Sequence, residues 1–488
     1  MTVRLIGGEM LCWSDLDGTH GPGPVRGAAL AALLAPAAGR VLIAGPHDPE
    51  LIDNSTAGGL TLLVRGVPDA ELLAARYADR PGVTVCCGGP EKLSAEQPFD
   101  RVVALAGLER LVSAEGAQLS WGETLEVLLS VLRPGGTLVL GVENPIGLHR
   151  LVALPRPLTD ADWSPAAGHD PTRPAGPDHL HDALDAAGLG VARSYAAYPE
   201  PEAPGLLLDD EVLGDESIRG YLEAALSRSA GAWTRTLTDP VDLAVTALRH
   251  AAARTLAPGW IVVAQKGPVT DALTGVGSIR RGADGWVTEL GAVPSGRTLE
   301  SLVIGACLRR DLPAVRDLLA GWQGGPAAGV AAGQVIAGPD GSLTALVPAG
   351  APAAALHELA TRLLRGGFAH PWPAVIGSAD LTTTLAAMAG RDLDPITEAP
   401  ITEAPITDAG PRELPFDQLT AERDRLAREL AEARAQAGWY EETLTAREND
   451  LHNARRTIQL LSGTGPARAG QAFVGGVRAA RRRLRRGP

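Results

Sequence analysis

The sequence has few cysteines, very few lysines and no long apolar run. Four cysteines occur among its 488 residues, and none forms a C-x-x-C pair or another spacing typical of metal ligands. We therefore expect no disulfide framework, and we expect Cys86 and Cys87 to be reduced core residues of a cytoplasmic protein. No N-terminal apolar segment resembles a signal peptide, and no run of about 18 apolar residues predicts a membrane-spanning helix.

Positive charge is also scarce over most of the chain. The formal net charge is −13, which argues against a nucleic-acid-binding body. Only two of the 44 basic residues are lysines, and this Ala/Gly/Arg bias is typical of a GC-rich bacterial genome. The exception is the C-terminal stretch 462–488, which contains seven Arg and no acidic residue. This stretch could contact an anionic membrane surface or another acidic partner, or it could simply be solvated.

Hydrophobic residues make up 45% of the chain, enough to form sizeable cores. At roughly 100–200 residues per domain, the length predicts two or three folded units. Short apolar runs alternate with helical stretches in the first part of the chain, at residues 41–44, 60–64, 83–87, 101–106 and 137–142. This alternation predicts an α/β fold with a doubly wound, mostly parallel sheet. Two later runs, 191–198 and 260–266, are further strand candidates.

The rest of the chain divides by composition. Two hairpin signals, at Asp284-Gly285 and Asp340-Gly341, predict a small α+β accessory domain. Three copies of a Pro-containing pentapeptide predict an extended linker. Apolar residues, counting Tyr440 and the alanines, occupy 12 of 14 heptad seam positions over residues 416–461, which favours a homo-oligomeric coiled coil, although a lone amphipathic helix remains the alternative. The predicted units are an irregular arm (1–24), the sheet domain (25–266, with an insertion at about 200–258), the accessory domain (268–392), the linker (393–415), the coiled coil (416–461) and a basic tail (462–488).

In a doubly wound sheet, ligands bind beyond the carboxyl ends of the strands. The loop after the first strand reads AGPHDP, and its single Gly45 suits either a ligand loop or an ordinary turn. Arg65 follows the second strand; it cannot accept a hydrogen bond from a ribose hydroxyl, but it could bind a carboxylate or phosphate, or be solvated. Glu91, after the third strand, could cap a helix or contact a ligand. Gly107, after the fourth strand, leaves room for a ligand.

The string LLSVLRPGGTLVLGVENPIG (residues 128–147) combines a helix, a Pro-Gly-Gly turn and a strand. Here the chain resembles the class I S-adenosylmethionine-dependent methyltransferases. The pieces VLIAG and PFDRVVALAGLERL match other strands of that family in the same order, and residues 191–198 and 260–266 resemble its closing antiparallel pair. The resemblance covers roughly residues 25–266. A narrower likeness, through ENPIGLHRL and AGLGVARSYAAYPEPEAP, is to bacterial methyltransferase-like proteins tied to surface polysaccharide and the cell envelope.

The resemblance implies a Rossmann-like methyltransferase fold, S-adenosylmethionine as cofactor, and a small-molecule or glycan acceptor. It assigns cofactor contacts to strand ends, at Ala44, Gly45, Arg65, Glu91, Leu105 and Gly107. Glu143 and His149 are the catalytic candidates, with His149 as a base or as an ordinary surface residue. Asn144 and Tyr198 are the substrate-binding candidates.

A second hypothesis follows from two positions that differ from the family's pattern. The family has a glycine-rich D/E-x-G-x-G-x-G loop and an acidic residue after the second strand, where this chain has AGPHDP and Arg65. The alternative is therefore a catalytically inactive methyltransferase-fold scaffold that oligomerises through its coiled coil. In either case we expect a cytoplasmic protein, with membrane association through the basic tail as an option.

Overall fold

The computed structural model describes residues 3–35, 39–93, 98–153, 170–229, 236–269, 278–283, 285–373, 375 and 377–392. The predicted linker, coiled coil and basic tail lie outside these residues. Two compact units divide the chain, 1–404 and 405–488, and all described residues belong to the first. Among the described helices, none is both long and apolar enough to cross a membrane.

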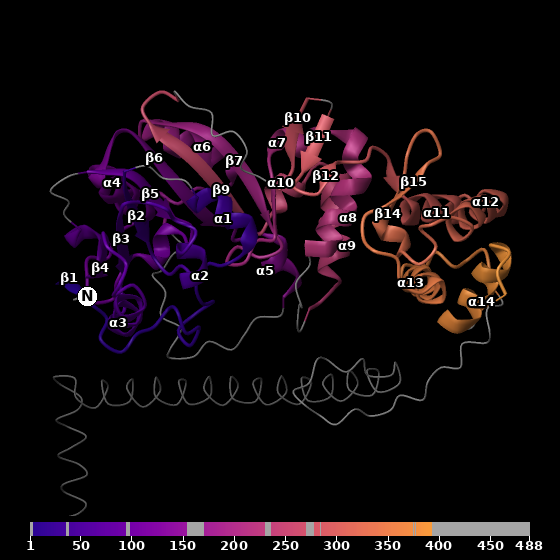
Figure 1. The fold of residues 1–488 in the computed structure, drawn as a ribbon, viewed down its shortest axis with the longest axis horizontal. Coiled ribbons are helices and arrows are strands. Elements are labelled where there is room, and N and C mark those ends of the chain that lie inside the picture. Colours follow the sequence, from indigo (N-terminus) through magenta and orange to yellow (C-terminus); the bar gives the residue numbers. More distant parts are fainter. Residues whose placement is uncertain are drawn as a thin grey trace, which may run out of the picture. The chain divides into compact units, whose positions relative to one another are not determined.

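A nine-stranded sheet dominates this unit (Figure 1). Six of its strands run parallel and the last three add antiparallel pairs. In sheet order they are β1 (Arg4–Gly7), β4 (Val83–Gly88), β3 (Gly59–Val64), β2 (Arg40–Ala44), β5 (Phe99–Ala104), β6 (Leu132–Glu143), β9 (Gly259–Lys266), β7 (Leu189–Tyr198) and β8 (Leu206–Leu208). The predicted doubly wound, mostly parallel sheet is confirmed.

Two of these strands were not predicted. The closing antiparallel pair β9 and β7 is where the resemblance implies it, but β8 continues the sheet beyond β7. The expectation that residues 1–24 are wholly irregular is wrong for residues 4–7, because β1 pairs in parallel with β4. Its sequence RLIG carries two exposed side chains, so no continuous apolar run signals it.

Each central strand buries side chains on both faces of the sheet, which explains the continuous apolar runs. In β2, Val41 and Ile43 belong to one core cluster, whereas Leu42 and Ala44 belong to the other. The first cluster includes helices α1 (Ala28–Leu34), α2 (Pro49–Ile52) and α3 (Val67–Arg76). The second includes α4 (Trp121–Val131), α6 (Pro177–Ala186), α8 (Arg219–Ser229) and α9 (Pro240–Arg249). Three short helices complete this part, α5 (Leu148–Val152), α7 (Asp210–Gly214) and α10 (Ala253–Leu256).

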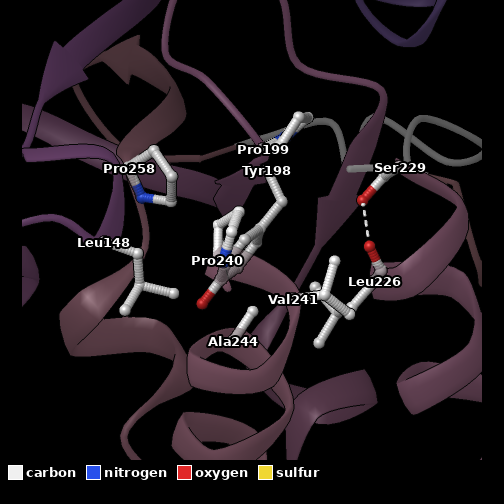
Figure 2. A pocket seen from close by; sticks show the side chains of 9 residues that line it. All are labelled: Leu148, Tyr198, Pro199, Leu226, Ser229, Pro240, Val241, Ala244 and Pro258. Atoms are coloured by element: carbon white, nitrogen blue, oxygen red, sulfur yellow. Dashed lines mark hydrogen bonds between the residues drawn. The ribbon is translucent and has the colours of Figure 1, made fainter. Parts of the chain in front are cut away.

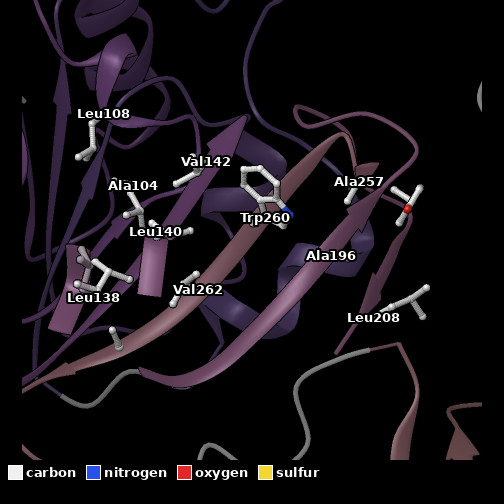
Figure 3. Packing of buried hydrophobic residues seen from close by; sticks show 14 of the residues in the cluster. Ala104, Leu108, Leu138, Leu140, Val142, Ala196, Leu208, Ala257, Trp260 and Val262 are labelled. Carbon is white, nitrogen blue, oxygen red and sulfur yellow. The ribbon is translucent and has the colours of Figure 1, made fainter. Parts of the chain in front are cut away.

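Trp260 anchors the antiparallel part of the sheet (Figure 3). It is 1% exposed, pairs with Val142 across β9 and β6, and donates its indole N–H to the Arg254 carbonyl at 2.8 Å. The ring thus buries its apolar body while its one polar group stays bonded. The same register sets Glu143, the last residue of β6, opposite Gly259.

Residues 297–389 contribute a smaller α+β part with a core of its own. The hairpin predicted at Asp340-Gly341 is confirmed between β14 and β15. The elements are β13 (Arg297–Thr298), α11 (Leu299–Leu308), α12 (Leu312–Gln323), β14 (Val335–Ala337), β15 (Leu343–Ala345), α13 (Pro352–Arg365) and α14 (Ser378–Met388).

The other predicted hairpin is confirmed in a three-stranded sheet of β10 (Arg280–Gly282), β11 (Gly285–Thr288) and β12 (Gly291–Ala292). Its Trp286 belongs to the core of the large sheet and donates its indole N–H to Asp215 Oδ2 at 2.7 Å. The predicted accessory range 268–392 therefore contains two parts, and the second one has its own core.

Candidate functional site

The carboxyl ends of the parallel strands meet at one edge of the sheet. From β2 the chain proceeds outward through β3 and β4, whereas β5 and β6 lie on the other side of β2. The loops after β2 and β5 therefore diverge, as they do at the ligand-binding edge of doubly wound sheets. We call residues 45–48, 65–69 and 89–92 the cofactor half of this edge, and residues 107–110 and 143–150 its acceptor half.

The chain's own side chains fill the loop after β2. A Cβ on Gly45 would lie 3.1 Å from Cδ2 of Leu111. The buried His47 ring lies with Nδ1 3.0 Å from the Gly45 carbonyl oxygen, and its Nε2 accepts the Leu105 N–H at 3.3 Å. These bonds place the proton on Nδ1, and burial lowers the pKa of His47 to about 4. A neutral imidazole thus ties the β2 loop to the end of β5 and occupies the Leu105 amide.

Arg65 is not solvated: it is 5% exposed and bonded on three sides. Its Nε and Nη2 donate to the two carboxylate oxygens of Asp15 at 2.7 and 2.8 Å, and its Nη1 donates to the Val112 carbonyl at 2.8 Å. The Trp13 ring lies 5.2 Å from the guanidinium carbon. Burial opposes a charge on Asp15, but the hydrogen bonds and charge of Arg65 lower the pKa of that carboxyl. The carboxylate that Arg65 binds belongs to this chain.

Residues 8–25, which we call the N-terminal arm, lie across the cofactor half. Met10 donates its N–H to the Arg65 carbonyl at 2.9 Å and accepts from the Val67 N–H at 3.0 Å. The approach is so close that a Cβ on Gly66 would collide with the carbonyl oxygen of Trp13. Only glycine at this position allows the arm to pass.

The middle of the arm is held by side chains from both halves of the edge. Asp69 accepts hydrogen bonds from the Ser14 hydroxyl at 2.5 Å and from the Asp15 N–H at 2.8 Å. Arg110 brings its Nη2 to 3.5 Å from Asp15 Oδ1 and donates from Nη1 to the Gly23 carbonyl at 2.5 Å. Asp15, 2% exposed, therefore lies between two arginines.

Glu91 and Gly107 also contact the chain itself. Glu91 Oε1 accepts the Ala117 N–H at 3.1 Å, which links the end of β4 to a later loop. Gly107 has φ +88°, a conformation that favours glycine, and a Cβ there would lie 2.8 Å from Oε2 of Glu109. The space that Gly107 was predicted to leave for a ligand is taken by this carboxyl group. Ala44 is the buried last residue of β2.

The structure brings the two catalytic candidates together. His149 Nε2 lies 3.0 Å from Glu143 Oε1, which also accepts from Arg150 Nε at 2.6 Å. Burial would raise the pKa of Glu143, but the hydrogen bond to His149 and the charge of Arg150 lower it. The His149 Nδ1 atom is buried without a hydrogen-bond partner among the described residues. An ionised carboxylate thus orients an imidazole at the end of β6.

The sequence analysis missed three charged residues near Glu143, namely Glu109, Arg173 and Glu202. Arg173 Nε lies 2.8 Å from Glu109 Oε1, and Arg173 Nη2 donates to the Glu143 carbonyl at 3.1 Å. Burial raises the pKa of Glu109. Burial also raises the pKa of Glu202, and the nearby negative charge of Glu143 raises it further. The available signals were the glycine two residues before Glu109 and the PEPEAP string that contains Glu202.

Asn144 and Tyr198 are both buried with their polar groups bonded to the main chain. The Asn144 amide donates to the Thr255 and Ala257 carbonyls at 2.8 Å each, so its N–H groups hold the turn after β6. The Tyr198 hydroxyl donates to the Ala253 carbonyl. Neither side chain presents a free donor to a substrate in this arrangement.

A small cavity lies beside Tyr198 (Figure 2). Its volume is about 20 Å³, room for roughly one water molecule. It is lined by Leu148, Tyr198, Pro199, Leu226, Ser229, Pro240, Val241, Ala244 and Pro258. No group of three or more His, Cys, Asp or Glu residues in the described part of the chain could hold a metal ion.

S-adenosylmethionine is the cofactor that the resemblance implies, and three observations test the fit. The open side of Gly45 faces Leu111, Arg65 offers no acceptor to a ribose hydroxyl, and the arm contacts the main chain at Gly66. With the arm in this position, the cofactor half does not fit an adenosyl group.

No family model and no curated protein matches this sequence. Solved structures do match. The N-methyltransferase NodS from Bradyrhizobium japonicum WM9 is 11% identical, with 49% of this chain and 93% of that chain covered, at a TM-score of 0.27. The methyltransferase in complex with the Haloferax volcanii Trm112 activator is 18% identical, with 49% of this chain and 89% of that chain covered, at a TM-score of 0.31. The 1,6-didemethyltoxoflavin-N1-methyltransferase of Burkholderia thailandensis was solved with S-adenosylhomocysteine. It is 17% identical, with 49% of this chain and 79% of that chain covered, at a TM-score of 0.26.

The class of the fold rests on the sheet itself. Parallel strands in the order β4-β3-β2-β5-β6, closed by antiparallel β9 and β7, form the Rossmann-like fold of class I methyltransferases.

Proposed function

We propose that this chain is an S-adenosylmethionine-dependent methyltransferase that acts on a small molecule or glycan. The observation that carries the proposal is the Glu143–His149 pair at the carboxyl edge of this sheet, with Glu109 and Glu202 beside it. In a doubly wound sheet this edge is where substrates bind. A role in polysaccharide or envelope synthesis follows from the narrower sequence likeness and is part of the proposal.

The acceptor half can orient a hydroxyl and remove its proton. Alignment of the acceptor and a positioned base are the two contributions that such a transfer needs from the protein. Glu143 is ionised and holds His149, so this pair is the proton acceptor that we propose. Glu109 and Glu202 have raised pKa values because they are buried, and they would accept a hydrogen bond from a sugar-like acceptor or donate one to it.

Cofactor binding requires the N-terminal arm to leave the cofactor half. The arm contacts Gly66 too closely for a ligand to enter beside it, and its Asp15 saturates Arg65. The structure therefore corresponds to a closed state of the proposed enzyme.

A specific observation favours the second candidate, the inactive scaffold. The Arg65–Asp15 pair and the neutral His47 brace are built from residues that replace the family's acidic residue and glycine-rich loop. In this reading the closed edge is permanent, and the working parts are the predicted coiled coil of residues 416–461, as a homo-oligomer, and the basic tail, on an anionic membrane. A cytoplasmic location is proposed for both candidates.

Calorimetric titration with S-adenosylhomocysteine distinguishes the two candidates. The variants to compare are the wild type, Gly66→Ala and Gly58→Ala. An added Cβ at residue 66 meets the arm, whereas one at residue 58 meets no atom within 4 Å. The enzyme predicts binding that is at least ten-fold tighter in Gly66→Ala than in the other two. No heat from any of the three at millimolar ligand would support the scaffold.

A further inference from the structure

We propose that Arg65 and Arg110 form a binding site for an anionic group, a phosphate or carboxylate, and that Asp15 occupies this site in the closed state. Nothing in this inference requires methyl transfer. It concerns the part of the edge between the end of β3 and the segment after β5.

The contact geometry is that of anion recognition. Arg65 meets the Asp15 carboxylate through two parallel hydrogen bonds of 2.7 and 2.8 Å, the fork geometry that suits carboxylate and phosphate groups alike. Arg110 approaches one of the same oxygens at 3.5 Å from the opposite part of the edge. Two arginines distant in sequence therefore converge on a single anion.

Asp15 is the carboxylate that both arginines contact. Both are largely buried, with exposed fractions of 5% and 14%, and burial lowers the pKa of Arg110. Of the nearby acids, Asp69 accepts from the main chain and Ser14 of the arm, and burial raises the pKa of both Asp69 and Glu202. Removing Asp15 without a replacement would take away the carboxylate that both buried arginines contact.

The occupant lies on a segment that can be exchanged. Buried residues of the arm around Asp15 are confined to positions 13–15, between exposed Leu11 and Cys12 on one side and exposed residues 17–19 on the other. Glycines with positive φ follow at Gly18, Gly21 and Gly23, and a Cβ at Gly21 would meet nothing within 4 Å. The polar contacts of Asp15 and Ser14 therefore hold most of this stretch in place.

The position of Arg65 points to the class of ligand. At the end of the second strand of a doubly wound sheet, an acidic residue binds the ribose hydroxyls, whereas an arginine accommodates a phosphate on the ribose. The chemistry shared by all candidates is a dianionic or anionic oxygen group. Its source is either a free anion or a nucleotide phosphorylated on the ribose.

The test uses the full chain with Asp15→Ala, and Asp17→Ala as the matched control. Asp17 lies on the same arm but is exposed, and its carboxylate accepts only from Thr19 among the described hydrogen bonds. Thermal unfolding is followed while phosphate or formate replaces chloride at constant ionic strength. We expect Asp15→Ala to be stabilised saturably by the anion, with apparent affinity at least ten-fold above that of the control, and Asp15→Ala/Arg65→Met to lose this response.

Adenosine and adenosine 2′-monophosphate then separate the two sources. A response to the nucleotide at least ten-fold stronger than to phosphate assigns a ribose phosphate, and equal responses assign a free anion. An Asp15→Ala protein that responds no more than Asp17→Ala overturns the site. If Asp15→Ala does not fold, the same comparison is made with Asp15→Asn. The anion response of Asp15→Ala does not depend on adenosyl binding, so failure of S-adenosylhomocysteine to bind would count against the proposed enzyme, whereas failure of phosphate and formate to stabilise Asp15→Ala would count against this site.

Discussion

His47 accepts the main-chain N–H of Leu105 on its Nε2 atom at 3.3 Å, although the two residues are 58 positions apart in the sequence. The bond ties the loop after β2 to the end of β5, across the point where the chain directions diverge. It also requires a neutral ring, because a protonated Nε2 could not accept. The protonation state of one histidine is therefore coupled to the link between these two strand ends.

Acid should destabilise the fold through this histidine. Burial lowers the pKa of His47 from 6.5 to about 4, so between these pH values the unfolded chain binds a proton that the folded chain does not. The stabilisation is fully present above pH 6.5 and is lost as the pH falls towards 4. We expect a loss of about 3 kcal/mol in the free energy of unfolding from this group, measured by urea denaturation.

The variant His47→Gln isolates that contribution. It should be less stable at neutral pH, yet its free energy of unfolding should fall less steeply than that of the wild type between pH 6.5 and 4. Parallel pH profiles for the two proteins would show that His47 is not the group responsible.

Breaking the pair between Asp15 and Arg65 should be costly. Removing one partner of a buried ion pair typically costs about 3–5 kcal/mol because the other charge stays buried. We expect a loss of this order in Arg65→Met, measured by urea denaturation. The control is Arg76→Met, because the exposed pair of Arg76 with Asp53 should contribute less than about 1 kcal/mol. Arg26→Met would be unsuitable, since Arg26 borders the arm. Equal losses in the two variants would contradict the buried pair.

The sheet was predictable because its signal is local. Each central strand is covered on both faces, so runs such as residues 41–44 and 60–64 are apolar without interruption. The Pro-Gly-Gly string and the strand after it carry the family resemblance, which implies the order of the later strands. Strand β1 escaped prediction because its pairing with β4 spans about 80 residues and its side chains are partly exposed.

The site was only partly predictable, because its contacts join distant segments. Glu143 and His149 are six residues apart, and the sequence placed them at the same strand end. Arg65 and Asp15 are 50 residues apart, and nothing near Arg65 in the sequence shows which carboxylate it binds. Gly107 was predicted to leave room for a ligand, but Glu109 fills this space, and the glycine is needed for its backbone φ of +88°.

Gly107→Ala should report on this packing. The substituted residue would carry both the strain of φ +88° and a contact of 2.8 Å with Glu109 Oε2. Gly188→Ala is the matched control, because its φ is +78° and its Cβ would meet nothing within 4 Å. Backbone strain costs of order 1–3 kcal/mol in both, and we expect Gly107→Ala to lose at least about 1 kcal/mol more in thermal or urea unfolding. Equal losses would mean that Glu109 moves away freely.

Truncation before Phe416 tests the predicted coiled coil. A coil over residues 416–461 would hold chains together through its apolar seam, so the full chain should be an oligomer and the truncated chain a monomer. Light scattering with mass determination measures both. If the full and the truncated chain form particles with the same number of chains, the coiled coil is not the basis of assembly.

Hydrogen exchange of the arm amides tests the central claim most directly, which is that the arm closes an edge that a ligand can open. The Met10 and Val67 amides are bonded between the arm and the segment after β3 in the closed state. We predict that saturating S-adenosylhomocysteine, added to the wild-type chain, speeds exchange at Met10 while the amides of residues 45, 47 and 48 become more protected. Binding with unchanged exchange at Met10, or no change anywhere in the cofactor half, would contradict the account.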